Sequence, residues 1–120
     1  MQYACAGGEF CMVQNSQLIK LKGDKYPIGG WQMKAERNFN YYDMDLEEDT
    51  ILYLHSDGFK DQFNTSDKKK FGKQRLYSLL DSISRLSFSD QTEMIELVFD
   101  LWKGETEQTD DVTLVGLQIS

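Results

Sequence analysis

Two aspartates stand beside apolar runs, where a strand would end or begin. Residues 51–59 read ILYLHSDGF, so that Asp57 follows a β-prone run, and residues 109–117 read TDDVTLVGL, so that Asp110 precedes another. If these runs are neighbouring strands, both carboxylates lie at one edge of a sheet. Carboxylate oxygens are hard ligands that suit Mg²⁺ or Mn²⁺. The pattern therefore predicts a divalent-cation site at Asp57 and Asp110.

Each acidic motif alone has a simpler interpretation. An Asp-Gly pair such as Asp57-Gly58 is common in turns, and Asp110-Asp111 before a strand is typical of a solvated loop. The hypothesis depends on the two motifs meeting at a shared edge.

Composition limits what such a site could belong to. The chain has 120 residues, 40% of them hydrophobic and 28% charged, which fits one domain or part of one. Its net charge of −7 argues against nucleic-acid binding, because a phosphate backbone requires clustered Lys and Arg. No apolar stretch approaches the roughly 20 residues of a membrane span, and the first residues lack the basic and apolar regions of a signal peptide, so we expect a cytoplasmic protein without membrane contact.

The few cysteines and the single histidine do not suggest zinc. Cys5 and Cys11 lack the spacing of zinc ligands around His55. We expect buried free thiols, and a packing role for His55 within its strand.

The first half of the chain favours strands. Short strands are expected at residues 3–6, 9–14 and 18–22, with hairpin turns at Gly7-Gly8 and Asn15-Ser16 that would give an antiparallel meander. Residues 23–30 read as a loop, followed by Trp31 in a packing role. A mixed alternation covers residues 37–46, and residues 50–54 favour a central strand.

The second half changes to a helical period. Residues 73–84 carry an apolar stripe, and Asp90 with Glu93 predicts the start of a second helix that ends near Gly104. Residues 112–119 should return to the sheet. We interpret Lys68-Lys69-Lys70 as a solvated loop. The order of elements predicts an α+β fold with helices covering an antiparallel sheet.

Five motifs, in order along the chain, resemble a known family. Residues 3–8 (YACAGG) look like its "NAGH" strand and turn, 26–29 (YPIG) like its "xPLG" loop, and 52–59 (LYLHSDGF) like its "LYTDG" motif. Residues 71–76 (FGKQRL) are similar to "FGxxRL", and 108–114 (QTDDVTL) to "DDxTLL". The chain thus resembles the C-terminal half of a SpoIIE/RsbU-type PP2C metal-dependent serine/threonine phosphatase domain.

The resemblance implies a fold and roles for particular residues. It implies an αββα layered sandwich in which Asp57 and Asp110 bind the catalytic metal, with two Mn²⁺ or Mg²⁺ ions in the complete domain. Asp111 would orient groups around the site, Gly58 would allow a tight turn beside the metal, and Asp61 falls where relatives often carry an acidic residue.

The implied reaction is hydrolysis of phosphoserine or phosphothreonine on a bacterial regulatory protein. The family resemblance suggests an anti-sigma-factor antagonist as the substrate, in signal transduction. Metal ions bridged by carboxylates can activate water and offset phosphate charge, so that no side-chain nucleophile is required.

Two departures from the family pattern matter. The family's Asp-Gly motif of the first half has no counterpart in the chain, and Gly8 stands where "NAGH" has histidine. We therefore expect residues 1–120 to be the C-terminal portion of a larger domain whose N-terminal half is absent, with weak or no activity alone. Open strand edges would favour self-association.

Three alternatives stay open. A haloacid-dehalogenase-type phosphatase needs Asp-x-Asp, but His55 stands two residues before Asp57. A noncatalytic phosphatase-like module for sensing or protein interaction would lack the upstream motif. An acidic interaction domain without metal would keep every measurable activity of the full protein after Asp57→Asn or Asp110→Asn.

Overall fold

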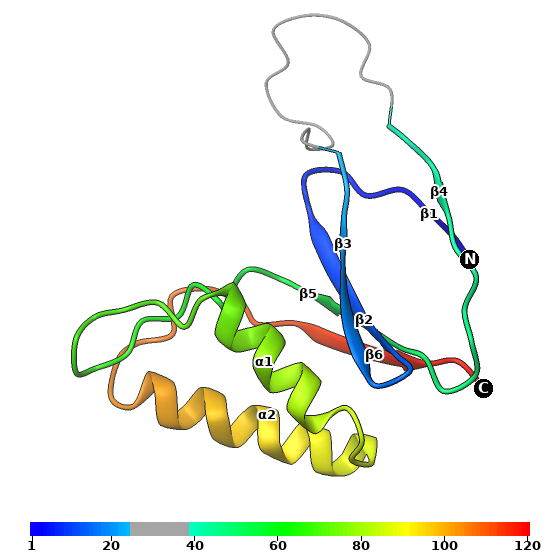
Figure 1. Cartoon of the computed structure of the whole chain (residues 1–120). Helices are drawn as coiled ribbons and strands as arrows, with labels where there is room; N and C mark the ends of the chain where they lie inside the picture. Colours follow the sequence, from blue (N-terminus) through cyan, green and yellow to red (C-terminus); the bar gives the residue numbers. More distant parts are fainter. Residues whose placement is uncertain (25–38) are drawn as a thin grey trace, which may run out of the picture.

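A four-stranded antiparallel sheet carries two helices on one face, and a short two-stranded ribbon lies beyond it (Figure 1). The computed structural model describes residues 1–24 and 39–120. The sheet order is β3-β2-β5-β6, and the ribbon pairs β1 with β4. The strands are β1 Gln2–Tyr3, β2 Glu9–Gln14, β3 Gln17–Lys22, β4 Tyr42–Asp43, β5 Ile51–His55 and β6 Leu114–Gln118.

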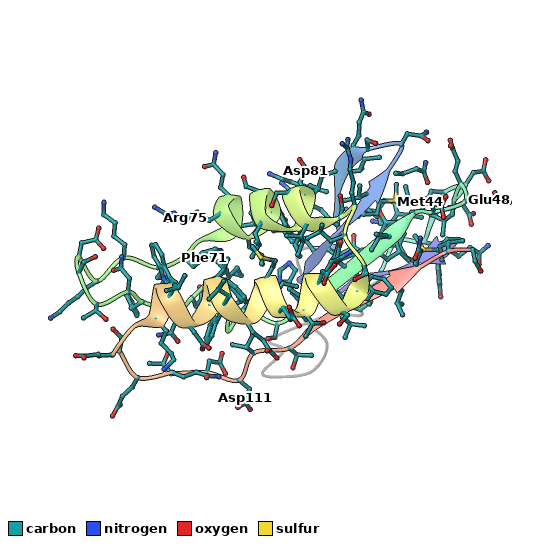
Figure 2. All side chains as sticks on the ribbon, turned by 90° about the horizontal axis from the view of Figure 1, so that it is seen from below. Met44, Glu48, Phe71, Arg75, Asp81 and Asp111 are labelled. Atoms are coloured by element: carbon teal, nitrogen blue, oxygen red, sulfur yellow. The ribbon has the colours of Figure 1, made fainter. Side chains whose placement is uncertain are left out.

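The main core lies between the sheet and the helices α1 (Lys73–Ile83) and α2 (Phe88–Lys103). Alternate residues of β2 and β5, such as Cys11 and Tyr53, are directed into it because side chains alternate across a strand. Helix α1 buries its predicted stripe there. Phe71 lies just before this helix (Figure 2) and packs edge-on against Trp102 of α2. The predicted α+β architecture, with an antiparallel sheet covered by helices, is confirmed.

The face of the sheet away from the helices is apolar but only partly covered. Leu54 pairs with Val115 and Leu52 pairs with Leu117 across β5 and β6. The exposed fractions of Leu54, Val115 and Leu117 are 43%, 40% and 48%. A smaller cluster around Met12 and Leu52 covers the remainder of this face.

The predicted meander is only half right. Asn15 and Ser16 do form the turn between β2 and β3, both with positive φ, as a two-residue hairpin requires. Gly7-Gly8, however, does not make a hairpin, because β1 pairs with β4 rather than with β2. The strand expected at residues 3–6 is correspondingly short, and residues beyond Tyr3 leave the ribbon.

The start of α2 also differs from the prediction. The helix begins at Phe88, and its N-cap is Ser87, whose hydroxyl accepts a hydrogen bond from the backbone N–H of Asp90. Asp90 therefore lies inside the first turn, where its charge suits the positive end of the helix dipole. The predicted end at Gly104 is confirmed.

Some predictions fall outside the described residues. The loop at 26–29, Trp31 and the beginning of the 37–46 segment belong to residues 25–38. Within residues 1–24 and 39–120, no helix combines the length and the apolar character needed to cross a membrane.

Truncating a buried helix residue should destabilise the protein much more than truncating an exposed one. Leu80 of α1 is fully buried, so Leu80→Ala should lower the free energy of unfolding by about 2–5 kcal/mol through the cavity it leaves. Urea denaturation measures the change. The matched variant Leu101→Ala, at a position on α2 that is 73% exposed, should change it by less than about 0.5 kcal/mol. Equal losses in the two variants would contradict this account of the core.

Candidate metal centre

The two predicted strands are neighbours in the sheet. Strands β5 and β6 are antiparallel, and His55 at the end of β5 pairs with Leu114 at the start of β6. The end of one strand and the beginning of the other therefore lie at the same edge. The loop that carries Asp57 meets the segment that carries Asp110 and Asp111 there.

Ser56 extends this pairing beyond the strands. Its backbone N–H donates to the carbonyl of Thr113 at 2.9 Å, and its hydroxyl accepts from the N–H of Thr113 at 2.9 Å. The same hydroxyl donates to the carbonyl of Asp111 at 3.2 Å. A serine hydroxyl can donate and accept at once, so this one side chain connects both loops. Ser56 was not among the residues predicted for the site, although its place between the strand and Asp57 was a signal.

Gly58 is required by close backbone contact. It is buried, and a Cβ atom on it would lie 2.1 Å from the carbonyl oxygen of Asp111. Backbone oxygen cannot yield as a flexible side chain can. Glycine is needed here so that the Asp57 turn can approach the 111–113 segment.

The predicted carboxylates differ in their surroundings. The Asp57 side chain is 70% exposed, and its Oδ1 lies 3.2 Å from Lys60 Nζ. Asp61 lies 3.5 Å from Lys70 Nζ, and its backbone N–H donates to the carbonyl of Asp57. Asp110 is exposed, and its Oδ1 accepts from the N–H of Asp111.

Asp57 also borders a pocket of about 500 Å³. The pocket lies where the loop before β2, the end of β3 and the end of β5 meet the start of α1. Its other lining residues are Gly7, Gly8, Glu9, Lys22, Gly23, Asp24, His55, Lys60 and Lys73.

The donor chemistry fits a hard divalent cation in part. Mg²⁺ is commonly held by one or two protein carboxylates and keeps several waters, and the Asp57 and Asp110 loops could supply two. Among residues 1–24 and 39–120, however, no group of three or more Asp, Glu, His or Cys side chains is arranged to hold a metal ion. The ligand roles of Asp57 and Asp110 stay predictions, and further ligands would have to come from elsewhere.

A polar network that was not predicted from the sequence lines part of the pocket. Glu9 of β2 accepts from Lys73 of α1 at 2.8 Å, and the ring Nε2 of His55 lies 3.2 Å from the hydroxyl of Tyr77. Burial alone would raise the pKa of Glu9, but hydrogen bonds from Lys73 and Tyr77 and the charges of Lys73 and Lys22 lower it overall. Burial, reinforced by Glu9, raises the pKa of Tyr77. His55 thus joins β5 to α1 and lines the pocket, which is more than the expected role of an ordinary strand residue.

The cysteines lie apart from this site. Cys11 is buried in the main core, and burial raises the pKa of its thiol to about 12, so it stays protonated. Cys5 is only half-buried.

Solved structures show that this arrangement is a PP2C fold. The SiaA-PP2C domain of Pseudomonas aeruginosa is similar with a TM-score of 0.87 and 24% identity, over 99% of this chain and 46% of that one. The PP2C phosphatase domain, with a fragment of the regulatory domain, of the cell fate determinant SpoIIE from Bacillus subtilis gives 0.65 and 15%, over 98% of this chain and 33% of that one. The chain therefore spans less than half of either solved chain.

The family follows from the sequence itself. Residues 1–120 match the family described as Stage II sporulation protein E (SpoIIE), and the chain belongs to that family. No curated protein sequence matches the chain. The predicted family is confirmed, and with it the predicted PP2C-like fold.

A side chain at position 58 should disturb the contact between the two acidic loops. Gly58→Ala should lower the free energy of unfolding by about 1–3 kcal/mol, because the backbone of the 111–113 segment must move. Chemical denaturation measures this. Gly8→Ala is the control: its Cβ would meet only the Cys5 sulfur at 3.2 Å, and its effect should be smaller. A Gly58→Ala protein as stable as the wild type would refute the close contact.

The Glu9–Lys73 pair should give an acid-dependent contribution to stability. Since the pKa of Glu9 is lowered in the folded state from its ordinary 4.5, the contribution is present above that value and is lost as the pH falls through the lowered pKa. At pH 7, Glu9→Gln should be less stable by about 1–2 kcal/mol. The denaturation midpoints of the wild type and of Glu9→Gln, recorded from pH 7 to pH 3, should approach each other as the pH falls. The exposed Glu93→Gln should follow the wild type throughout, and a Glu9→Gln deficit that does not depend on pH would contradict the ionic origin.

Proposed function

We propose that the chain is part of a metal-dependent phosphatase that hydrolyses phosphoserine or phosphothreonine on a regulatory protein. The observation that carries the proposal is the set of hydrogen bonds from Ser56 to Thr113 and Asp111, which brings the two acidic loops to one edge. Membership of the SpoIIE family and the PP2C fold support the reaction class.

Phosphate monoesters resist hydrolysis because an anionic centre repels nucleophiles and the leaving group is poor. In the proposed site, Asp57 and Asp110 hold Mn²⁺ or Mg²⁺. When bound, such ions supply an activated water and offset the charge of the phosphoryl oxygens. The chain itself positions the carboxylates through backbone contacts, and the pocket beside Asp57 receives the phosphorylated residue.

The substrate in this proposal is a phosphorylated regulatory protein of the anti-sigma-factor antagonist type. The support is the family resemblance together with the pocket's lysines. Lys22, Lys60 and Lys73 line the pocket. They balance the charges of its acidic residues Glu9, Asp24 and Asp57, so in a chain whose net charge is −7 the pocket repels a phosphoryl group less than the acidic surface does.

We also propose that the chain is the C-terminal portion of its phosphatase domain. The apolar outer face at Leu54, Val115 and Leu117 would then be covered by the other portion, which would contribute the missing carboxylates. Covering such a face stabilises by about 25 cal/mol per Å² of buried apolar area. The 120 residues alone would bind metal weakly and turn over little, and their open edges at β3 and β6 would favour self-association.

A noncatalytic phosphatase-like interaction module is the second candidate. The observation that favours it is that the described residues hold no group of three or more ligands suited to a metal. It differs from the first candidate in predicting no turnover by the full-length protein under any metal condition.

Removing either carboxylate should abolish activity. Asp57→Asn and Asp110→Asn should each lower phosphatase activity of the full-length protein at least about a hundredfold, because each loses a charged oxygen ligand. Release of phosphate from a phosphoserine peptide with added Mn²⁺ measures the effect. Asp81→Asn, on the exposed side of α1 (Figure 2), removes the same charge outside the site and should retain full activity. Wild-type rates in both site variants would exclude the enzyme proposal.

A further inference from the structure

Lys60 is the positive charge nearest to the candidate ligand Asp57. Its Nζ lies 3.2 Å from Asp57 Oδ1 and 4.0 Å from Asp61 Oδ1. The Lys60 side chain is 28% exposed, against 70% for that of Asp57. The carbonyl of Lys60 also accepts from the N–H of Gly72 at 2.8 Å, so the start of α1 holds the base of this side chain.

This pair conflicts with a cation at Asp57. A divalent ion bound to that carboxylate would meet the ammonium group at ion-pair distance, and like charges that close repel each other strongly. Asp61 offers limited compensation because Lys70 already lies 3.5 Å from it. Lys60 must therefore leave Asp57 when a metal ion binds.

The Lys60 side chain already lines the pocket, so it can stay there after it leaves Asp57. Lys60 and Asp57 both line it, as do Lys22 and Lys73. Lys73 is held by Glu9 at 2.8 Å, and both residues of that pair also line the pocket. Lys60 is thus the lysine of the pocket whose partner a divalent cation would remove.

We propose that Lys60 occupies the Asp57 carboxylate until a divalent cation displaces it, and that its ammonium group then binds the phosphoryl oxygens of the substrate. The proposal rests on the proposed function and names the residue that links metal binding to phosphate binding. In this exchange the ammonium group trades one anionic partner, the carboxylate, for another, the phosphoryl oxygens.

The test uses Lys60→Gln, which keeps a polar side chain and removes the charge. Calorimetric titration of the full-length protein with Mn²⁺ should show binding about threefold to tenfold tighter than in the wild type, because the competing charge is gone. With Mn²⁺ saturating, inorganic phosphate should bind at least about fivefold more weakly. The matched control is Lys69→Gln, which removes a charge paired with Asp67 and leaves Asp57 and Asp61 untouched, so both affinities should stay unchanged.

Each result decides the matter. Unchanged Mn²⁺ affinity or unchanged phosphate affinity in Lys60→Gln, while Asp57→Asn weakens Mn²⁺ binding, overturns this inference alone. If Asp57→Asn binds Mn²⁺ as the wild type does, the proposed metal site is wrong and the inference falls with it. Thermal unfolding of each variant confirms that the comparison is between folded proteins.

Discussion

The antiparallel pairing of β5 with β6 is the constraint on which the candidate site depends. Five residue pairs, from Ile51↔Gln118 to His55↔Leu114, bring together segments that are far apart in the chain. Ser56 continues the pairing with hydrogen bonds to Thr113 and Asp111. The two acidic loops are therefore held without using the Asp57 carboxylate, which stays largely exposed and is paired only with Lys60 among the ion pairs of the described residues.

Polar contacts in the core join helix α2 to strand β5 and to the segment that follows it. The hydroxyl of Tyr53 in β5 donates to Gln91 Oε1 at 2.8 Å, and the indole N–H of Trp102 donates to the carbonyl of Gln62 at 2.8 Å. Burial raises the pKa of Tyr53 to about 12, so this hydroxyl keeps its proton throughout the physiological range. Since an unpaired buried donor is costly, these contacts define how α2 sits against the strand and the turn that follows it.

Local patterns in the sequence were sufficient where one signal dominates. The helical stripe of α1, the Asn15-Ser16 hairpin and the β-prone run of β5 were all predicted, and neighbouring strands followed from them. The hairpin at Gly7-Gly8 failed because β1 pairs with a distant segment that no local pattern reveals. At the start of α2, Ser87, Ser89 and Asp90 all have side chains that can cap a helix. The hydrogen bond from the N–H of Asp90 to the Ser87 hydroxyl shows that Ser87 is the N-cap, and the sequence alone does not distinguish them. Two ion pairs could be found only from the three-dimensional structure: Lys60 with Asp57, and Lys73 with Glu9.

The candidate ligand Asp57 and part of the uncovered apolar face lie close together on the sheet. Leu54 and Val115 are paired one position away from His55↔Leu114, and Asp57 follows two residues later. At about 3.3 Å per residue along a strand, this apolar pair lies roughly 10 Å from the Asp57 backbone. A segment that buries the pair is therefore close enough, under the proposed function, to add carboxylates to the proposed metal site. Under the proposed function, burial of apolar surface and completion of the site are one event, which would make activity depend on assembly of the whole domain.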